Sequence, residues 1–268
     1  WKAFNALSVN GQIAPNAYVS VSSQANLLLQ TVHSQAGALL GPYRMGNKYA
    51  HGQLISENED LQSQGPWGRS SNFGYTVWSN NSLSKYFINK VPYAFEYTDV
   101  QAGIGYAHSA YAVLTTDLTL LVRAEANAML GNYDAAAADL NTEVKAYSSG
   151  ALSVTLEGIK NFYNGIGYYT PTAPTPKKKF NTAFSIEPTT QEPLLHAILH
   201  LRRIMPLGEG WRLQDVKRYG IVIYRRTLNA SSHITDVKDS LTVNDLRRAI
   251  QLPQDVITAG LTANPRNK

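Results

Sequence analysis

The sequence predicts a mainly α-helical protein with helical hairpins, long irregular loops and a few short strands. Residues 116–147 show the spacing of two consecutive helices, and residues 192–226 show a further helical stretch. Residues 41–80, by contrast, are rich in glycine, asparagine and serine and show no apolar period. Apolar residues three and four apart indicate an amphipathic helix, and the loss of that spacing indicates irregular structure.

The predicted hairpin, Thr116–Tyr147, is the clearest pattern in the chain. Its first half places leucine, valine and alanine on one face, and its second half repeats apolar residues four apart. Gly131 breaks the period at a position that suits a left-handed helix end. Two helices joined by so short a turn fold back antiparallel, and small residues at Ala124 and Ala136 would let them approach closely.

The segments before the hairpin are predicted to be less regular. Residues 21–40 suggest a short helix, and Leu83–Ala112 suggests short strands or extended pieces around Pro92. Gly103-Ile104-Gly105 resembles the start of a dinucleotide-binding fingerprint. The third glycine and the strand-to-helix context are both missing, so this interpretation is rejected.

After the hairpin, Gly150–Glu192 is predicted to be a loop, and its run PTAPTPKKK is predicted to be an exposed linker. Glu192–Arg226 then reads as helical, with Pro193 suited to a first helical turn. The chain is expected to end with a short helix before Pro253, another that Gly260 terminates, and an extended tail.

Two histidines on the later helix, His196 and His200, are four residues apart and share a face. Zinc peptidases need His-Glu-x-x-His, and Ala197 stands where the glutamate would be. We therefore expect a partly buried or surface histidine pair rather than a metal site. The chain has no cysteine, which excludes disulfides and thiolate metal sites, and we expect no cofactor.

The charge of this 268-residue chain is uneven, with a net value of +5. From His196 onward there are 12 Lys/Arg and 6 Asp/Glu, so this part is basic. Basic regions can bind nucleic acid. Here the basic residues come in dispersed pairs between apolar positions, so solvated helix faces are expected instead. The pairs are Arg202-Arg203, Lys217-Arg218, Arg225-Arg226 and Arg247-Arg248.

An aromatic-rich stretch precedes the hairpin and carries the predicted ligand site. Disordered segments are poor in aromatics, so an ordered irregular surface is expected. Aromatic rings can cover the C–H face of a sugar while amides and guanidinium groups bind hydroxyls; alternatively, the rings fill an irregular core. Trp67 lies in a Gly-Pro-Trp-Gly-Arg turn that is expected to present the indole outward. The candidate ligand residues are Tyr43, Arg44, Trp67, Arg69, Asn72, Tyr75 and Trp78.

Three stretches in a fixed order add a family expectation. They are LLVRAEANAMLGNYDAAAADLN in the hairpin, GEGWRLQDVKRYG after the second helical stretch, and LPQDVITAGLTANPR near the end. Together they resemble the SusD/RagB-type outer-membrane nutrient-binding lipoproteins, and the resemblance covers about residue 80 to the end. It implies tetratricopeptide-like hairpins and a single SusD-like C-terminal domain over residues 1–268. This domain would divide into a ligand region (1–112), a hairpin (113–150), a loop excursion (151–192) and C-terminal helices (193–268).

The resemblance also implies a function. Members bind oligosaccharides or polysaccharides, and in some cases peptides, at the bacterial cell surface, and deliver them to a SusC-type TonB-dependent outer-membrane transporter. The resemblance implies a binding protein without enzymatic activity, held at the outer membrane by a lipid anchor. The chain begins at Trp1 without an initiator methionine, so we expect a mature product or a fragment that lacks the anchored cysteine.

Two other classes of function were weighed. A glycoside hydrolase needs two carboxylates that flank the scissile bond, and Glu57, Glu59 and Asp60 lie in the irregular segment. They are too close in sequence to be assigned to opposite faces of a sugar, and no G-x-S-x-G motif is present. The third class is a scaffold, because helical repeats mostly serve protein contacts.

Overall fold

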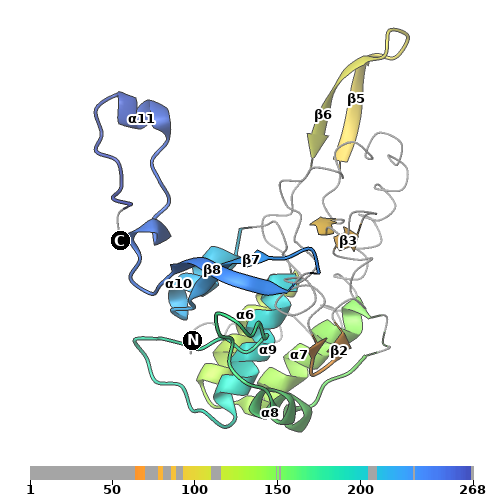
Figure 1. Cartoon of the computed structure of the whole chain (residues 1–268). Helices are drawn as coiled ribbons and strands as arrows, with labels where there is room; N and C mark the ends of the chain where they lie inside the picture. Colours follow the sequence, from red (N-terminus) through yellow and green to blue (C-terminus); the bar gives the residue numbers. More distant parts are fainter. Residues whose placement is uncertain are drawn as a thin grey trace.

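The computed structural model shows a helical body from which short two-stranded ribbons extend (Figure 1). This agrees with the mainly helical prediction at the level of fold class. None of the helices in the described part is long and apolar enough to cross a membrane. The residues that the structure describes are 64–69, 78–80, 86–88, 93–109, 116–148, 150, 152–204, 210–231 and 233–266.

The predicted hairpin is confirmed as helices α6 (Thr116–Met129) and α7 (Tyr133–Tyr147). Gly131 adopts φ 81°, the left-handed conformation that its position predicted. The helices are antiparallel, because the start of α6 contacts the end of α7 through a hydrogen bond from the Tyr147 hydroxyl to Asp117. Ala124 and Ala136 have no exposed surface, in agreement with close approach of the two helices.

Helix α9 (Gln191–Ile204) forms the centre of this body, and every residue in it except Glu192 is buried. It packs against α6 and α7, and also against α8 (Leu156–Gly165) and α10 (Arg212–Arg218). A helix that is buried on all sides must satisfy its polar groups internally. Its N-terminus is capped by Glu187, whose carboxylate accepts the backbone N–H groups of residues 189–191.

Helix α8 lies in the stretch that the sequence predicted to be a loop, and that prediction is wrong. The side chain of Thr155 accepts a hydrogen bond from the backbone N–H of Gly158 at 3.1 Å and so caps the helix. Ile159 and Tyr163 are four residues apart and point into the core. The helix has fewer than three turns, so its apolar spacing is short, and the prolines and glycines around it made that spacing hard to recognise.

The segment between α8 and α9 is irregular, as predicted, but of its three lysines only Lys179 is exposed as a linker would require. Lys177 and Lys178 are both buried. The Lys178 ammonium donates to the Thr175 carbonyl at 2.9 Å and lies 3.4 Å from the centroid of the Tyr169 ring. The aliphatic parts of the lysine side chains therefore cover apolar surface, while carbonyl oxygens and aromatic faces interact with the ammonium groups.

Gly220, just after α10, explains how this segment is held against the helices. Its φ is +58°, and a Cβ atom built on it would lie 2.2 Å from the Asn181 carbonyl oxygen. Asn181 donates from its backbone to the Tyr219 carbonyl and from its amide to the Gly220 carbonyl, each at 2.9 Å. Only glycine allows this approach of two backbones.

The strands form four antiparallel pairs in the described residues. The strands predicted within Leu83–Ala112 are present. The prediction of helix as far as Arg226 is wrong at its end, because residues 223–226 belong to a strand, β7, and its partner β8 was not predicted either. The β5–β6 ribbon extends away from the helices (Figure 1). The pairs are β1 (Gln64–Gly65) with β2 (Gly68–Arg69), β3 (Trp78–Asn80) with β4 (Tyr86–Ile88), β5 (Tyr93–Asp99) with β6 (Ile104–Ser109), and β7 (Ile223–Leu228) with β8 (Ile234–Leu241).

The end of the chain contains the short 3₁₀ helix η3 (Leu246–Arg248) and α11 (Gln254–Thr258), which Gly260 follows with φ 105°. Both elements lie where short helices were predicted. Helix α11 has no buried residue and belongs to an arm beside the β7–β8 ribbon (Figure 1). Gln251 and Asn264 close the arm through hydrogen bonds of 2.9 and 3.1 Å.

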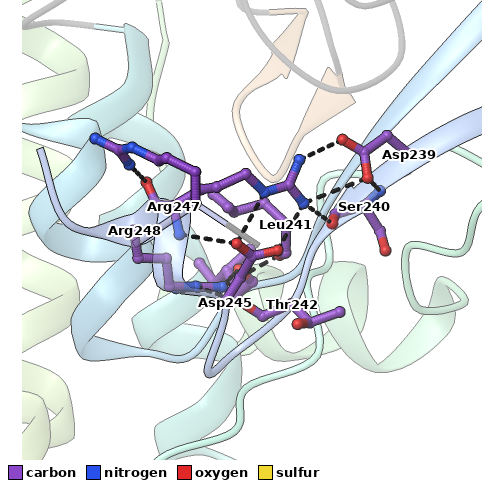
Figure 2. A network of polar contacts seen from close by, with 9 residues as sticks. Asp239, Ser240, Leu241, Thr242, Asp245, Arg247 and Arg248 are labelled. Carbon is purple, nitrogen blue, oxygen red and sulfur yellow. Dashed lines mark hydrogen bonds and ion pairs between the residues drawn. The ribbon is translucent and has the colours of Figure 1, made fainter. Parts of the chain in front are cut away.

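The two arginines of η3 have different environments (Figure 2). Arg247 pairs with the carboxylates of Asp239 and Asp245 and is partly exposed. Arg248 is buried, and its guanidinium donates to backbone carbonyls at the ends of three elements. The accepting residues are Thr242, Val216, Ile221 and Leu241.

The expectation that the basic pairs lie on solvated faces is therefore wrong for part of them. Arg202, Arg203 and Arg248 are buried, whereas Lys217, Arg218 and Arg225 are exposed. The buried arginines connect elements inside the body, where a guanidinium can donate several hydrogen bonds in fixed directions. These buried arginines of the basic C-terminal part thus contribute to packing and not to a positively charged surface.

Candidate functional site

Most of the predicted ligand residues lie outside the described part of the chain. Tyr43, Arg44, Asn72 and Tyr75 are not among the described residues, and the same is true of the carboxylates weighed for a hydrolase. Arg69 and Trp78 are described through their backbone only, in β2 and β3. The predicted cluster as a whole therefore stays a prediction.

Trp67 is described completely, and its predicted outward orientation is wrong. The Gly-Pro-Trp-Gly-Arg sequence does form a turn, between β1 and β2, but the indole is 3% exposed and belongs to the hydrophobic core. A Cβ atom on Gly65 would lie 2.6 Å from the indole, so the ring folds back over this glycine. A ring without exposed surface cannot stack on a sugar in solution.

The indole packs against an aromatic and histidine cluster that α9 organises. The rings of Trp67 and His200 are 5.1 Å apart. The Tyr163 hydroxyl and His200 Nδ1 are hydrogen-bonded at 3.1 Å. His196 stacks between Phe180, at 4.2 Å, and Tyr163, at 5.4 Å. Both histidines are thus core residues, each 2% exposed, and lie deeper than the partly buried or surface pair that was expected.

A polar chain connects this cluster to the surface. His196 Nε2 lies 3.2 Å from Glu192 Oε1, and the Tyr168 hydroxyl donates to the same oxygen at 2.6 Å. Tyr168 is 42% exposed, whereas His196 is buried. The Lys177 ammonium lies 4.5 Å from the centroid of the Tyr168 ring. An exposed aromatic, a carboxylate and an ammonium therefore meet at the N-terminal end of α9.

The charge states in this chain follow from burial and from neighbouring charges. Burial lowers the pKa of His196, and the charges of Lys177 and Lys178 act in the same direction against Glu192. For Glu192, burial acts to raise the pKa, but hydrogen bonds from His196 and Tyr168 lower it overall. Partial burial and the Glu192 charge raise the pKa of Tyr168 to about 12. At neutral pH the ionised Glu192 carboxylate therefore lies between two neutral hydrogen-bond donors, Tyr168 and His196.

A small cavity lies beside the buried end of this chain. It has a volume of about 10 Å³, roughly what one water molecule needs, and apolar atoms supply most of its wall. Cationic side chains border it, but a space of this size is too small for a sugar or another organic ligand. Its described lining comprises Pro176, Lys178, Phe180, His196, Leu199, His200, Arg203, Arg212 and Ile221.

A second polar cluster connects the hairpin string to the WRLQDVKRYG string through side-chain contacts. Glu125 of α6 accepts from Arg202 of α9 at 2.5 Å and from the Tyr219 hydroxyl, and it lies 3.2 Å from Arg218 Nε. Arg202 also donates to Asp215 of α10 at 2.9 Å. Burial raises the pKa of Asp215, while the Arg202 charge opposes this shift.

A separate ion pair connects the two helices of the hairpin. Arg123 of α6 donates to both carboxylate oxygens of Asp139 of α7, at 2.6 and 3.0 Å. Residues of the RAEA string thus contact residues of the DLN string and of the WRLQDVKRYG string. These contacts pack the helices, and all the side chains involved except Arg218 are buried rather than open to a ligand.

Sequence reasoning missed Tyr168 and Glu192. The only sequence signal for this site is a pair of tyrosines after a glycine, in a segment predicted to be a loop. Among the described residues, no group of three or more histidine, aspartate or glutamate side chains could hold a metal ion.

Searches against protein-family models, curated proteins and solved structures found no match to this chain.

Proposed function

We propose that this protein binds glycans at the bacterial cell surface and delivers them to a SusC-type TonB-dependent outer-membrane transporter. In this proposal the α6–α7 hairpin is a tetratricopeptide-like repeat, the chain is not an enzyme, and a lipid anchor in the precursor attaches it to the outer membrane.

The observation that supports the proposal is the network around Glu125. The family resemblance depends on short strings that are far apart in sequence, and such strings can match by chance. Here Glu125 of the first string contacts Tyr219 of the second across 94 residues. Residues that are needed together for packing give a physical reason for the strings to occur together.

The proposal is tested by isothermal titration calorimetry of the full chain against soluble starch, xyloglucan, laminarin and polygalacturonate. We expect saturable binding to at least one of them. The variants Tyr75→Ala and Trp78→Ala test the predicted aromatic site, and we expect each to weaken binding. Tyr106→Ala, on the β5–β6 ribbon, is a matched control with an exposed ring.

Absence of binding to every polysaccharide would contradict the glycan proposal. If a mixed peptide library then binds, peptide cargo, the alternative within the same family, replaces it. Release of reducing ends from a bound polysaccharide would contradict the non-enzymatic assignment. Capture of a TonB-dependent transporter without glycan affinity would favour the scaffold.

A further inference from the structure

The side chain of Tyr168 combines exposure with firm attachment. It is 42% exposed, yet its hydroxyl donates to Glu192 at 2.6 Å, and the Lys177 ammonium lies 4.5 Å from its ring centroid. Glu192 is itself bound to His196, which lies inside the aromatic core. An exposed tyrosine is thereby connected through Glu192 to the aromatic core.

The backbone on both sides of Tyr168 is also held. The Tyr169 backbone N–H donates to the Lys177 carbonyl at 2.7 Å, and the Thr175 hydroxyl donates to the Gly167 carbonyl at 3.0 Å. A ligand that contacts a ring already fixed in this way loses less conformational entropy on binding than one that must first order it. The arrangement is therefore suited to recognition.

The groups around the ring suit one chemical class of ligand. Lys177 lies over one face of the Tyr168 ring, which leaves the other face and the ring edge as the surfaces that a ligand could contact. That face can cover the C–H groups of a sugar ring, because tyrosine presents an apolar body with a polar tip. At the tip, the Glu192 carboxylate is an acceptor for sugar hydroxyl groups.

The negative charge of Glu192 also indicates which sugars this site would favour. A carboxylate beside the stacking face repels a second carboxylate, whereas the Lys177 ammonium is on the covered side of the ring. A uronate residue is thus disfavoured at this position. We propose that Tyr168, with Glu192 beside it, is a binding site for a neutral pyranose residue; this inference rests on the proposed function and concerns a different element from the predicted loop cluster.

The test compares three variants by calorimetry with the polysaccharide that the unmodified chain binds best among those named above. We expect Tyr168→Ala to weaken binding about tenfold, which is typical of losing a central aromatic contact. Tyr168→Phe keeps the ring and should weaken binding much less. Tyr97→Ala removes a ring of similar exposure, 46%, on the β5–β6 ribbon and should leave affinity unchanged.

Glu192→Gln tests the charge argument, because glutamine keeps an acceptor for Tyr168 without the negative charge. We expect it to increase binding to polygalacturonate relative to the neutral polysaccharides. Circular dichroism should show that all variants keep their helical content.

The possible outcomes separate the two proposals. If the unmodified chain binds a neutral polysaccharide and Tyr168→Ala binds it equally well, the Tyr168 site is wrong while the glycan function stands. If binding is confined to polygalacturonate, the neutral class is wrong. If no polysaccharide binds at all, the proposed function is wrong and this site with it.

Discussion

Glu125 and Arg202 form a buried ion pair of 2.5 Å that ties α6 to α9. Each partner has a further contact, Glu125 with Tyr219 and Arg202 with Asp215. Two carboxylates, one guanidinium and one phenol hydroxyl thus connect three helical segments. A buried charge keeps this position only while its partners remain, because burial without compensation is costly.

Replacement of Arg202 by methionine should destabilise the protein by about 3–5 kcal/mol, because Glu125 and Asp215 would stay buried without their shared cation. Urea denaturation monitored by circular dichroism measures the free energy of unfolding. Arg225→Met is the control: Arg225 is exposed on β7, and its loss should cost less than about 0.5 kcal/mol. Equal effects of the two variants would contradict the role given to the buried pair.

Gly220→Ala should lower the free energy of unfolding by about 2 kcal/mol or more. The new Cβ would meet the Asn181 carbonyl at 2.2 Å, and alanine is also strained at φ +58°. Gly210→Ala isolates the second effect, because Gly210 has φ +85° and open space around its Cβ position. A thermal melt should therefore show a much smaller loss for Gly210→Ala.

The stability of the protein should depend on the protonation of His196. Its folded pKa is lowered below 6.5 by burial, so the unfolded chain binds the proton more readily. The free energy of unfolding should therefore rise as the pH increases toward about 6.5. The stability that neutral His196 contributes should be lost as the pH falls below this value. Glu192, Lys177 and Lys178 face the ring and set the size of the effect.

This pH dependence is measured by urea denaturation at several pH values between 5 and 8, for the unmodified chain and for His196→Phe. Phenylalanine keeps the stacking between Phe180 and Tyr163 but cannot titrate. The difference between the two curves should flatten above pH 6.5. A difference that is constant across the range would contradict the assignment.

Adjacent arginines with equal charge should respond very differently to substitution by lysine. Arg248→Lys should cost about 3 kcal/mol, because a lysine cannot donate in the directions of the buried carbonyls of Val216 and Ile221. Arg247→Lys retains a cation beside Asp239 and Asp245 at a partly exposed position and should cost less than about 1 kcal/mol. Chemical denaturation of both variants provides the comparison.

Trp67→Ala should destabilise the fold by about 3–5 kcal/mol, as expected for a large buried side chain. A residue that served only to stack on a ligand would show the opposite pattern, with weaker binding and unchanged stability. Thermal melts measured with and without the best-binding polysaccharide distinguish these results, since a purely structural role lowers both melting temperatures by a similar amount.

The helical hairpin could be predicted from sequence because its signal is local. The spacing of the leucines and alanines and the position of Gly131 depend only on neighbours within one or two turns. The same holds for the short strands around Pro92. Gly103 lies in the β5–β6 turn with φ 66°, which is a hairpin and not the strand-to-helix turn of a dinucleotide-binding fingerprint.

The burial of polar residues could not be predicted in the same way. Arg248 is inside the fold because backbone carbonyl groups 27 and 32 residues away accept its hydrogen bonds. Lys177 and Lys178 are buried against tyrosine rings nine residues earlier, in an irregular segment that has no periodic pattern. The buried indole of Trp67 has the same origin, because a turn sequence fixes the backbone but not what packs against it.

The candidate site at Tyr168 depends on the same kind of long-range placement. Tyr168 and Glu192 are 24 residues apart and meet only because the irregular segment packs along the start of α9. A sequence pattern can show that a segment lacks regular structure, but it cannot show which of its residues remain exposed.

The burial of α9 on every side also imposes an order on synthesis. The ribosome releases α6 and α7 before α9, so the apolar face of the hairpin stays uncovered until the chain has extended past Ile204. Glu125 must likewise wait for Tyr219, 94 residues later. During this interval the nascent chain exposes a surface that would bind other apolar chains, so its yield in a cell is set by how quickly that face is covered.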